Sequence, residues 1–193
     1  ISGGMDFVSE DADPTDPIAA ADRLVDLKTD VSHGTHVATT IGFKNDGASL
    51  NGFPVSVLNV RVLGADGSAN DSVAKGILYA AGLDNISGTV APTAIPIKVI
   101  NLSLGGANYN QVLCSAVTDA RAQGLVVVAS SGNEQETEPG LINYPAACPG
   151  VISVGATNSA GEITSYSNQN AYVDISAPGG DGEDRDGDGN NDY

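Results

Sequence analysis

A chain of 193 residues, 41% of them hydrophobic, is long enough to bury the core of one α/β domain but short for two. Its 24 acidic and 8 basic residues give a net charge of -16, which repels phosphate backbones and anionic lipid surfaces alike. We therefore expect neither nucleic acid nor a membrane as a partner, and no apolar run approaches the roughly 20 residues that a spanning helix needs.

The chain opens with a loop-rich lead-in over residues 1–30, where glycine and proline interrupt an acidic stretch. Regular structure is expected to begin in VSHGTHVA, residues 31–38. Ser32 is a candidate N-cap, and apolar residues follow His33 at helical spacing as far as Gly42. The pattern predicts a helix that starts at His33.

Apolar strands and amphipathic helices then alternate along the chain. Runs rich in Val and Ile predict strands at 56–63, 97–104, 125–130 and 151–157. Helices are expected after Asn70 or Asp71 and over 111–123, where Gly124 would end the second helix. This alternation predicts an α/β fold with a parallel sheet covered on both faces by helices.

Polar residues gather where two of these strands end, which is where open α/β sheets bind ligands. Ser103, with Gly105 and Gly106, stands at the end of one strand, and Ser130, Ser131, Gly132 and Asn133 stand at the end of the next. Such a backbone can accept a peptide as an added strand, and the amide of Asn133 can donate to a developing oxyanion. Each segment taken alone also fits an ordinary glycine turn.

Both histidines of the chain, His33 and His36, lie in the first predicted helix. A zinc site is not indicated, because the Glu of an H-E-x-x-H motif and a third histidine are absent from the sequence. The positive end of a helix dipole keeps an imidazole neutral, which suits a general base at His33. A purely structural role is the alternative for either histidine.

Taken in order, these segments resemble the subtilisin-like serine proteases, or subtilases. The resemblance covers most of residues 31–180, which form the core of the expected domain, and is carried by HGTHVA, VRVLGADGS, KVINLSLGG, VVVASSGNE, YPAAC, VISVGAT, SYSN and DISAPGG. It implies a three-layer α/β fold with a mostly parallel central sheet and helices on both faces, incomplete here at both ends. It also implies a secreted serine endopeptidase whose partner is a peptide or protein substrate.

The resemblance further implies a role for each matching position. His33 would be the general base for a serine nucleophile, Asn133 would be the side-chain oxyanion donor, and His36 would be structural. The two edges of the substrate cleft would be formed by Ser103, Leu104 and Gly105 and by Gly67 and Ser68. One wall of the primary specificity pocket would be formed by Ser130, Ser131 and Gly132, with Glu134 and Asn143 near its rim or base.

The sequence departs from the subtilase pattern at two catalytic motifs. It contains neither the D-T-G or D-S-G motif of the catalytic aspartate nor the G-T-S-M-A motif of the serine, and Asp6 in GGMDFV does not match the former. We therefore expect both residues to lie outside these 193 residues, and the fragment alone to be inactive. Thr39 also stands where the family usually has Gly. The alternative function is a non-catalytic calcium-binding or pseudoprotease module that keeps the cleft for peptide binding.

Residues 181–193 form an acidic, glycine-rich segment. Its residues Asp184, Asp186, Asp188, Gly189 and Asp192 fit the first nine positions of a calcium loop, D-x-D-x-D-G-x-x-D. A structural calcium ion is therefore a possible cofactor, and a disordered insertion is the alternative reading.

The two cysteines, Cys114 and Cys148, permit one disulfide, although the residues alone leave two buried thiols equally open. The extracellular setting implied by the resemblance favours the disulfide. The resemblance also leaves strands of the sheet without neighbours, so that self-association of the fragment through exposed edges is a further expectation.

Overall fold

The structure is a computed structural model of the 193-residue chain. It describes residues 4–10, 12, 14, 33–42, 44, 45, 48, 49, 55–64, 71–92 and 96–182. The chain divides into two compact units, Ile1–Ala91 and Pro92–Tyr193. In the part of the chain that the structure describes, no helix combines the length and apolarity needed to cross a membrane.

The first unit is built around a short parallel ladder and a buried helix. β1 (Met5–Asp6) pairs with β4 (Val60–Arg61), and α2 (Ser72–Ala80) presents a mostly buried face. The ring of Phe7, directly after β1, packs edge-on against Tyr79 of α2, with 5.7 Å between ring centroids. This unit also holds α1 (His33–Gly42) and the antiparallel pair β2 (Lys44–Asn45) and β3 (Ala48–Ser49).

Two details of the first unit differ from the sequence-based expectation. Of the strand expected at 56–63, only Val60–Arg61 joins a ladder, and its partner β1 lies in the stretch that the sequence indicates as loop-rich. Two residues are too few to produce a recognisable alternation of apolar and polar side chains. Val60 and Arg61 form a ladder because they pair with β1, which lies far away in the sequence: Arg61 and Asp6 are 55 positions apart.

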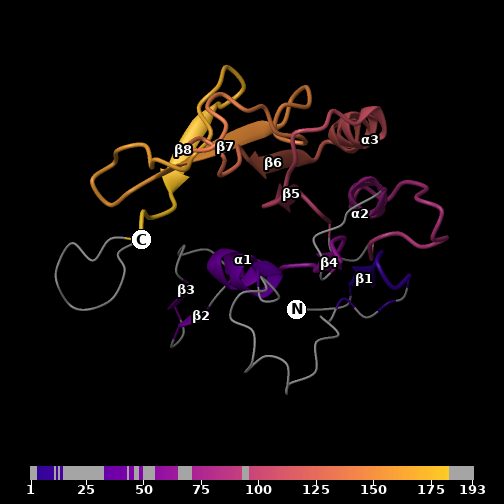
Figure 1. Ribbon diagram of the computed structural model, residues 1–193. Helices are drawn as coiled ribbons and strands as arrows, with labels where there is room; N and C mark the ends of the chain where they lie inside the picture. Colours follow the sequence, from indigo (N-terminus) through magenta and orange to yellow (C-terminus); the bar gives the residue numbers. More distant parts are fainter. Residues whose placement is uncertain are drawn as a thin grey trace. The chain divides into compact units, whose positions relative to one another are not determined.

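The second unit contains a four-stranded parallel sheet, visible in Figure 1 as neighbouring arrows whose colours pass from red to yellow. Its order is β5 (Val99–Leu102), β6 (Val126–Ser130), β7 (Ile152–Thr157) and β8 (Ile175–Pro178). All three ladders are parallel. The α/β class with a mostly parallel sheet is therefore confirmed, and β8 is a strand that the apolar pattern did not predict.

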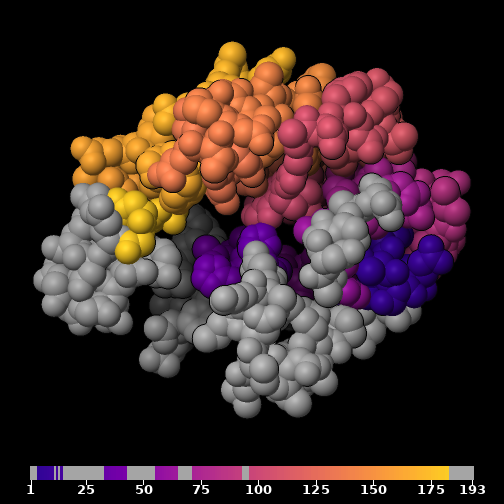
Figure 2. All heavy atoms as spheres, in the orientation of Figure 1, coloured from indigo at the N-terminus to yellow at the C-terminus, as the bar shows by residue number. Residues whose placement is uncertain are grey.

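Helix α3 (Gln111–Ala122) packs against β6. It begins at Asn110, whose side chain accepts a 3.1 Å hydrogen bond from the N–H of Leu113, and Gly124 follows its end with a φ of +86°. The inner face of the helix is formed by Cys114, Ala116, Val117 and Ala120, all of them buried. Figure 2 shows the atoms of the second unit packed into one continuous body.

A disulfide between Cys114 and Cys148 connects α3 to the loop that precedes β7. The two Cα atoms are 5.2 Å apart, and both side chains are buried. The bridge closes a stretch with a sequence separation of 34 and joins two elements that flank the same sheet.

Candidate active site

The catalytic candidates are divided between the two units. His33 is the first residue of α1 in the first unit, whereas Asn133 follows β6 in the second unit. Three sets of candidates lie outside the described residues: the N-cap Ser32, the cleft residues Gly67 and Ser68, and the calcium ligands Asp184, Asp186, Asp188 and Asp192.

The histidine helix starts and ends where the sequence predicts. His33 is half-buried at its first position, while His36 is exposed one turn further on. The hydroxyls of Thr39 and Thr40 each donate a 2.9 Å hydrogen bond to the carbonyl of His36. Thr39, the departure from the family pattern, therefore places its hydroxyl against the preceding turn of its own helix.

Two of the predicted cleft segments lie side by side because their strands are neighbours in the sheet. The β5–β6 ladder pairs Leu102 with Ala129, so that the segments 103–105 and 130–132 leave the sheet at the same, carboxyl edge. The first segment runs on to Gly106, which forms an antiparallel bridge with Tyr144 through hydrogen bonds of 2.9 and 3.0 Å. This bridge brings residues 143 and 144 to the same end of the sheet.

Asn133 has an exposed side chain at this edge. Its backbone N–H donates to the carboxylate of Glu134 at 2.9 Å. Among the described residues, no hydrogen-bond partner is present for its side-chain amide. The amide is therefore available to donate to a ligand.

Behind Asn133 lies a polar network of Glu134, Asn143 and Asn168, of which the sequence analysis missed Asn168. Glu134 accepts hydrogen bonds from the side-chain amides of Asn143 at 2.9 Å and Asn168 at 2.8 Å. Asn168 is 1% exposed and Asn143 3% exposed. The matching segment SYSN contains Asn168, but nothing in its residue types assigns a chemical role to that asparagine, because the partners lie on another connection of the chain.

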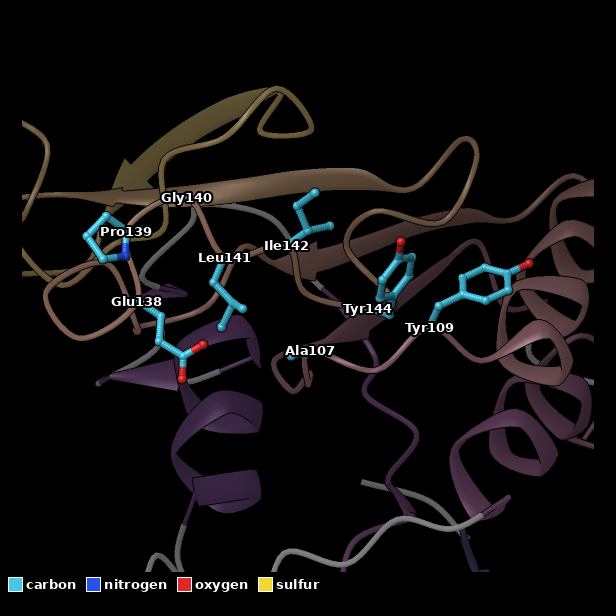
Figure 3. Close-up of a pocket in the computed structure, with 8 residues that line it drawn as sticks. All are labelled: Ala107, Tyr109, Glu138, Pro139, Gly140, Leu141, Ile142 and Tyr144. Carbon is cyan, nitrogen blue, oxygen red and sulfur yellow. The ribbon is translucent and has the colours of Figure 1, made fainter.

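A pocket of about 530 Å³ lies beside these segments. Figure 3 shows the rings of Tyr109 and Tyr144 next to each other at one end and Glu138 and Pro139 at the other. The two rings meet edge-on, with centroids 5.3 Å apart. The pocket is lined by Ala107, Tyr109, Glu138, Pro139, Gly140, Leu141, Ile142 and Tyr144.

Within the described ranges, no three His, Cys, Asp or Glu side chains are grouped so as to hold a metal ion. The predicted calcium ligands all belong to residues 184–192. Their donor set consists of carboxylate oxygens at alternating positions, which are the hard ligands that calcium prefers. The residue types present at these positions therefore fit a calcium ion.

Residues 8–193 match the family described as "Subtilase family". The chain belongs to the subtilase family. This subtilase is 39% identical over 151 residues to an "Extracellular protease" of Xanthomonas campestris pv. campestris, a match that covers 76% of the chain and 25% of that protein. It is 35% identical over 183 residues to the "Subtilisin" of Bacillus pumilus, which covers 93% of the chain and 58% of that protein.

Solved structures agree with this membership. The subtilase superposes on a protease of Pseudoalteromonas arctica with a TM-score of 0.76 and 33% sequence identity, covering 93% of the chain and 57% of that structure. A cold-adapted subtilisin-like serine proteinase matches with a TM-score of 0.67 and the same identity. The predicted family and its α/β fold are therefore confirmed, and the chain spans between a quarter and about three fifths of the relatives described here.

Proposed function

We propose that this chain is the part of a secreted serine endopeptidase that carries the general base, the oxyanion donor and most of the substrate cleft. The observation that supports this most directly is the edge formed by β5 and β6. There, the segments 103–105 and 130–132 lie on adjacent parallel strands, and Asn133 follows with an exposed amide that no described residue engages.

The proposed reaction uses each of these groups in turn. The hydroxyl of a serine nucleophile attacks the carbonyl carbon of the scissile peptide bond, and the imidazole of His33 takes its proton. The amide of Asn133 donates to the oxyanion of the tetrahedral intermediate. When the intermediate collapses to the acyl-enzyme, His33 returns the proton to the departing amine, and water then releases the acyl group by the same sequence in reverse.

The substrate chain would bind as an added strand along residues 103–105, and the proposed second contact with it is made by Gly67 and Ser68. Main-chain hydrogen bonds then supply affinity without regard to sequence, and the pocket lined by Ser130, Ser131 and Gly132 supplies selectivity. Since the 193 residues contain neither the G-T-S-M-A nor the D-T-G motif, the serine and the aspartate belong to other parts of the proposed enzyme. The 193-residue chain alone is therefore expected to be inactive.

Labelling by a fluorophosphonate tests the base and the nucleophile together, because the probe reacts with a serine only when a base activates it. We expect the full-length protein to be labelled and His33→Ala to abolish labelling. His36→Ala is the matched control, since the exposed His36 lies in the same helix and should leave labelling unchanged. If the His33→Ala protein is still labelled, another residue is the general base. If the unaltered full-length protein is not labelled, the alternative of a non-catalytic peptide-binding module is favoured.

The oxyanion role of Asn133 has a kinetic test. Asn133→Asp keeps the size of the side chain and removes its N–H donors, so kcat should fall while KM changes little. Subtilisin itself is the type case for such a donor, and there the loss is roughly 100- to 1,000-fold in kcat. An unchanged kcat would remove Asn133 from the reaction.

Calcium binding by residues 184–192 is a separate part of the proposal, supported by the alternating carboxylates. A calcium titration of the full-length protein should raise its melting temperature, by an amount that corresponds to about 2.7 kcal/mol when calcium is at 100 times its Kd. The paired substitution Asp186→Asn and Asp188→Asn should reduce this rise. A melting temperature that does not respond to calcium would exclude the site.

A further inference from the structure

The residues on either side of Asn133 are held by one residue, through its side chain and its backbone, from a distant connection of the same unit. We propose that Asn168 is a positioning residue, which holds the backbone of residues 131–134 so that the amide of Asn133 faces a developing oxyanion. This inference rests on the proposed peptidase function, because it gives a part in that reaction to a residue too deeply buried to touch the substrate.

Asn168 lies on the connection between β7 and β8, and every polar group of its side chain is engaged. Its Nδ2 donates to the carbonyl of Ser131 at 3.0 Å and to Oε2 of Glu134 at 2.8 Å. Its Oδ1 accepts from the N–H of Glu134 at 2.8 Å, and its backbone N–H donates to the carbonyl of Gly132 at 3.0 Å. One residue therefore holds three of the four positions from 131 to 134.

The loop needs such support because it has left the ladder of β6, which ends at Ser130. The N–H of Ser131 still donates to Val154 at 2.9 Å, but the carbonyls of Ser131 and Gly132 are hydrogen-bonded by Asn168 instead of a neighbouring strand. Gly132 has a φ of +108°, and a Cβ at this position would overlap the side chains that form the network. The conformation of this loop therefore depends on residues from another connection.

The contact with the carboxylate of Glu134 requires a hydrogen-bond donor on the side chain at position 168. Oε2 of Glu134 accepts three hydrogen bonds, from the Asn133 N–H, from Asn143 and from Asn168, and all three donors are uncharged. Within the described part of the chain no cation pairs with this carboxylate. An aspartate at position 168 would replace one of the three donors by a second negative charge at the same contact.

The test is Asn168→Asp in the full-length protein, measured as kcat and KM for a peptide substrate. We expect kcat to fall about 10- to 100-fold at pH 8 with KM within about threefold, because a displaced oxyanion donor weakens the transition state more than the bound substrate. Glu134 is the ionisable side chain that hydrogen-bonds Asn168 among the described residues. Two carboxyl groups in contact raise the pKa of one of them, so protonation should restore a donor as the pH is lowered. The ratio of variant to wild-type kcat should therefore rise towards pH 5.5.

The matched control is Asn158→Asp on the same connection. Asn158 is also buried and also donates to a carboxylate, that of Glu162 at 3.2 Å, but its hydrogen bonds stay within its own turn. This variant should lose stability, keep kcat within about twofold of the wild type and show no rise of the kcat ratio at low pH.

The outcomes separate the inference from the function on which it rests. If the wild type neither hydrolyses peptides nor reacts with a fluorophosphonate, the proposed function is overturned, and this inference with it. If the wild type is active and Asn168→Asp behaves like Asn158→Asp, only the positioning role is overturned. Should Asn168→Asp fail to fold, the pair Asn168→Asp with Glu134→Gln removes the added charge; it should fold with a kcat below that of the wild type, because the carbonyl of Ser131 still lacks its donor. A pair with wild-type kcat would then contradict the role.

Discussion

Arg61 donates a 2.6 Å hydrogen bond to the carboxylate of Asp6, and the two residues face each other in the parallel ladder of β1 and β4. Asp6 is 2% exposed and also accepts the N–H groups of Val8 at 2.7 Å and Ser9 at 3.0 Å. Both charges are therefore satisfied inside the first unit, within the two-residue ladder of β1 and β4. The ion pair joins β1 to β4, and the sequence-based interpretation that Asp6 is not the catalytic aspartate stays a prediction.

Asp6→Asn should destabilise the protein by about 3 kcal/mol, because it leaves the guanidinium of Arg61 without its counter-charge in a buried setting. The measurement is urea unfolding of the full-length protein in the presence of a serine-protease inhibitor. Asp71→Asn is the control, since the Asp71–Lys75 pair has an exposed carboxylate and should contribute less than about 0.5 kcal/mol. Equal effects of the two substitutions would contradict the structural role of Asp6.

The contribution of Asp6 should also depend on pH. Burial raises the pKa of Asp6, but hydrogen bonds from the Ser9 N–H, the Arg61 guanidinium and the Val8 N–H outweigh burial, so that the pKa lies below its ordinary 3.8. Since the folded pKa is lowered, the stabilisation is complete above the unfolded pKa and is lost as the pH falls through the folded one. The difference in stability between wild type and Asp6→Asn should be constant down to about pH 5 and shrink below about pH 4. If the difference in stability between wild type and Asp6→Asn grew as the pH was lowered, the predicted sign of the pH dependence would be wrong.

The disulfide between Cys114 and Cys148 should stabilise the second unit by about 4 kcal/mol in the chain-entropy model, given its sequence separation of 34. Replacing both cysteines by alanine should lower the melting temperature accordingly. Alkylation of the unfolded protein should modify no cysteine before reduction and two after it. Alkylation of either cysteine without reduction would show that the bridge is absent.

Gly132→Ala should destabilise the protein by at least about 3 kcal/mol and lower kcat, because the added methyl combines an unfavourable φ with overlap against Glu134, Asn143 and Asn168. Gly124→Ala is the control: its φ is +86°, but nothing lies within 4 Å of the added Cβ. Only the backbone cost of about 1 kcal/mol should remain there, without any change in kcat. A similar loss at both glycines would mean that φ alone decides the effect.

Gly76→Ala in α2 should change the stability of the protein in two opposite ways, through helix propensity and through side-chain packing. Alanine is better than glycine in a helix by about 1 kcal/mol, but a Cβ at this position would lie 2.6 Å from Cγ1 of Val62. Overpacking costs about 1–3 kcal/mol, so the net change should be destabilising. In a double-mutant cycle, Val62→Ala should relieve this overlap and give a coupling of about 1 kcal/mol. Purely additive effects would show that the two positions are not in contact.

Local pattern was sufficient to predict those elements whose side chains repeat with a recognisable period. Helix α1 starts at His33 as expected, and α3 buries Ala116, Val117 and Ala120 on the predicted face. Strands β6 and β7 lie within their predicted runs because buried parallel strands are continuous in Val and Ile. Strand β8 was not predicted from the sequence, because its four residues are all exposed and do not form a run of Val and Ile.

The sequence by itself therefore determined the family, the α/β class and the strand ends at which Ser103 and Ser130 stand, because these follow from local periodicity and from motifs of consecutive residues. Only the tertiary structure decided which distant groups support them. The contact of Asn168 with Glu134 spans 34 positions and that of Arg61 with Asp6 spans 55. Hydrogen bonds of this kind depend on the directions of two side chains after the sheet has formed, and neither partner carries a local pattern that identifies the other.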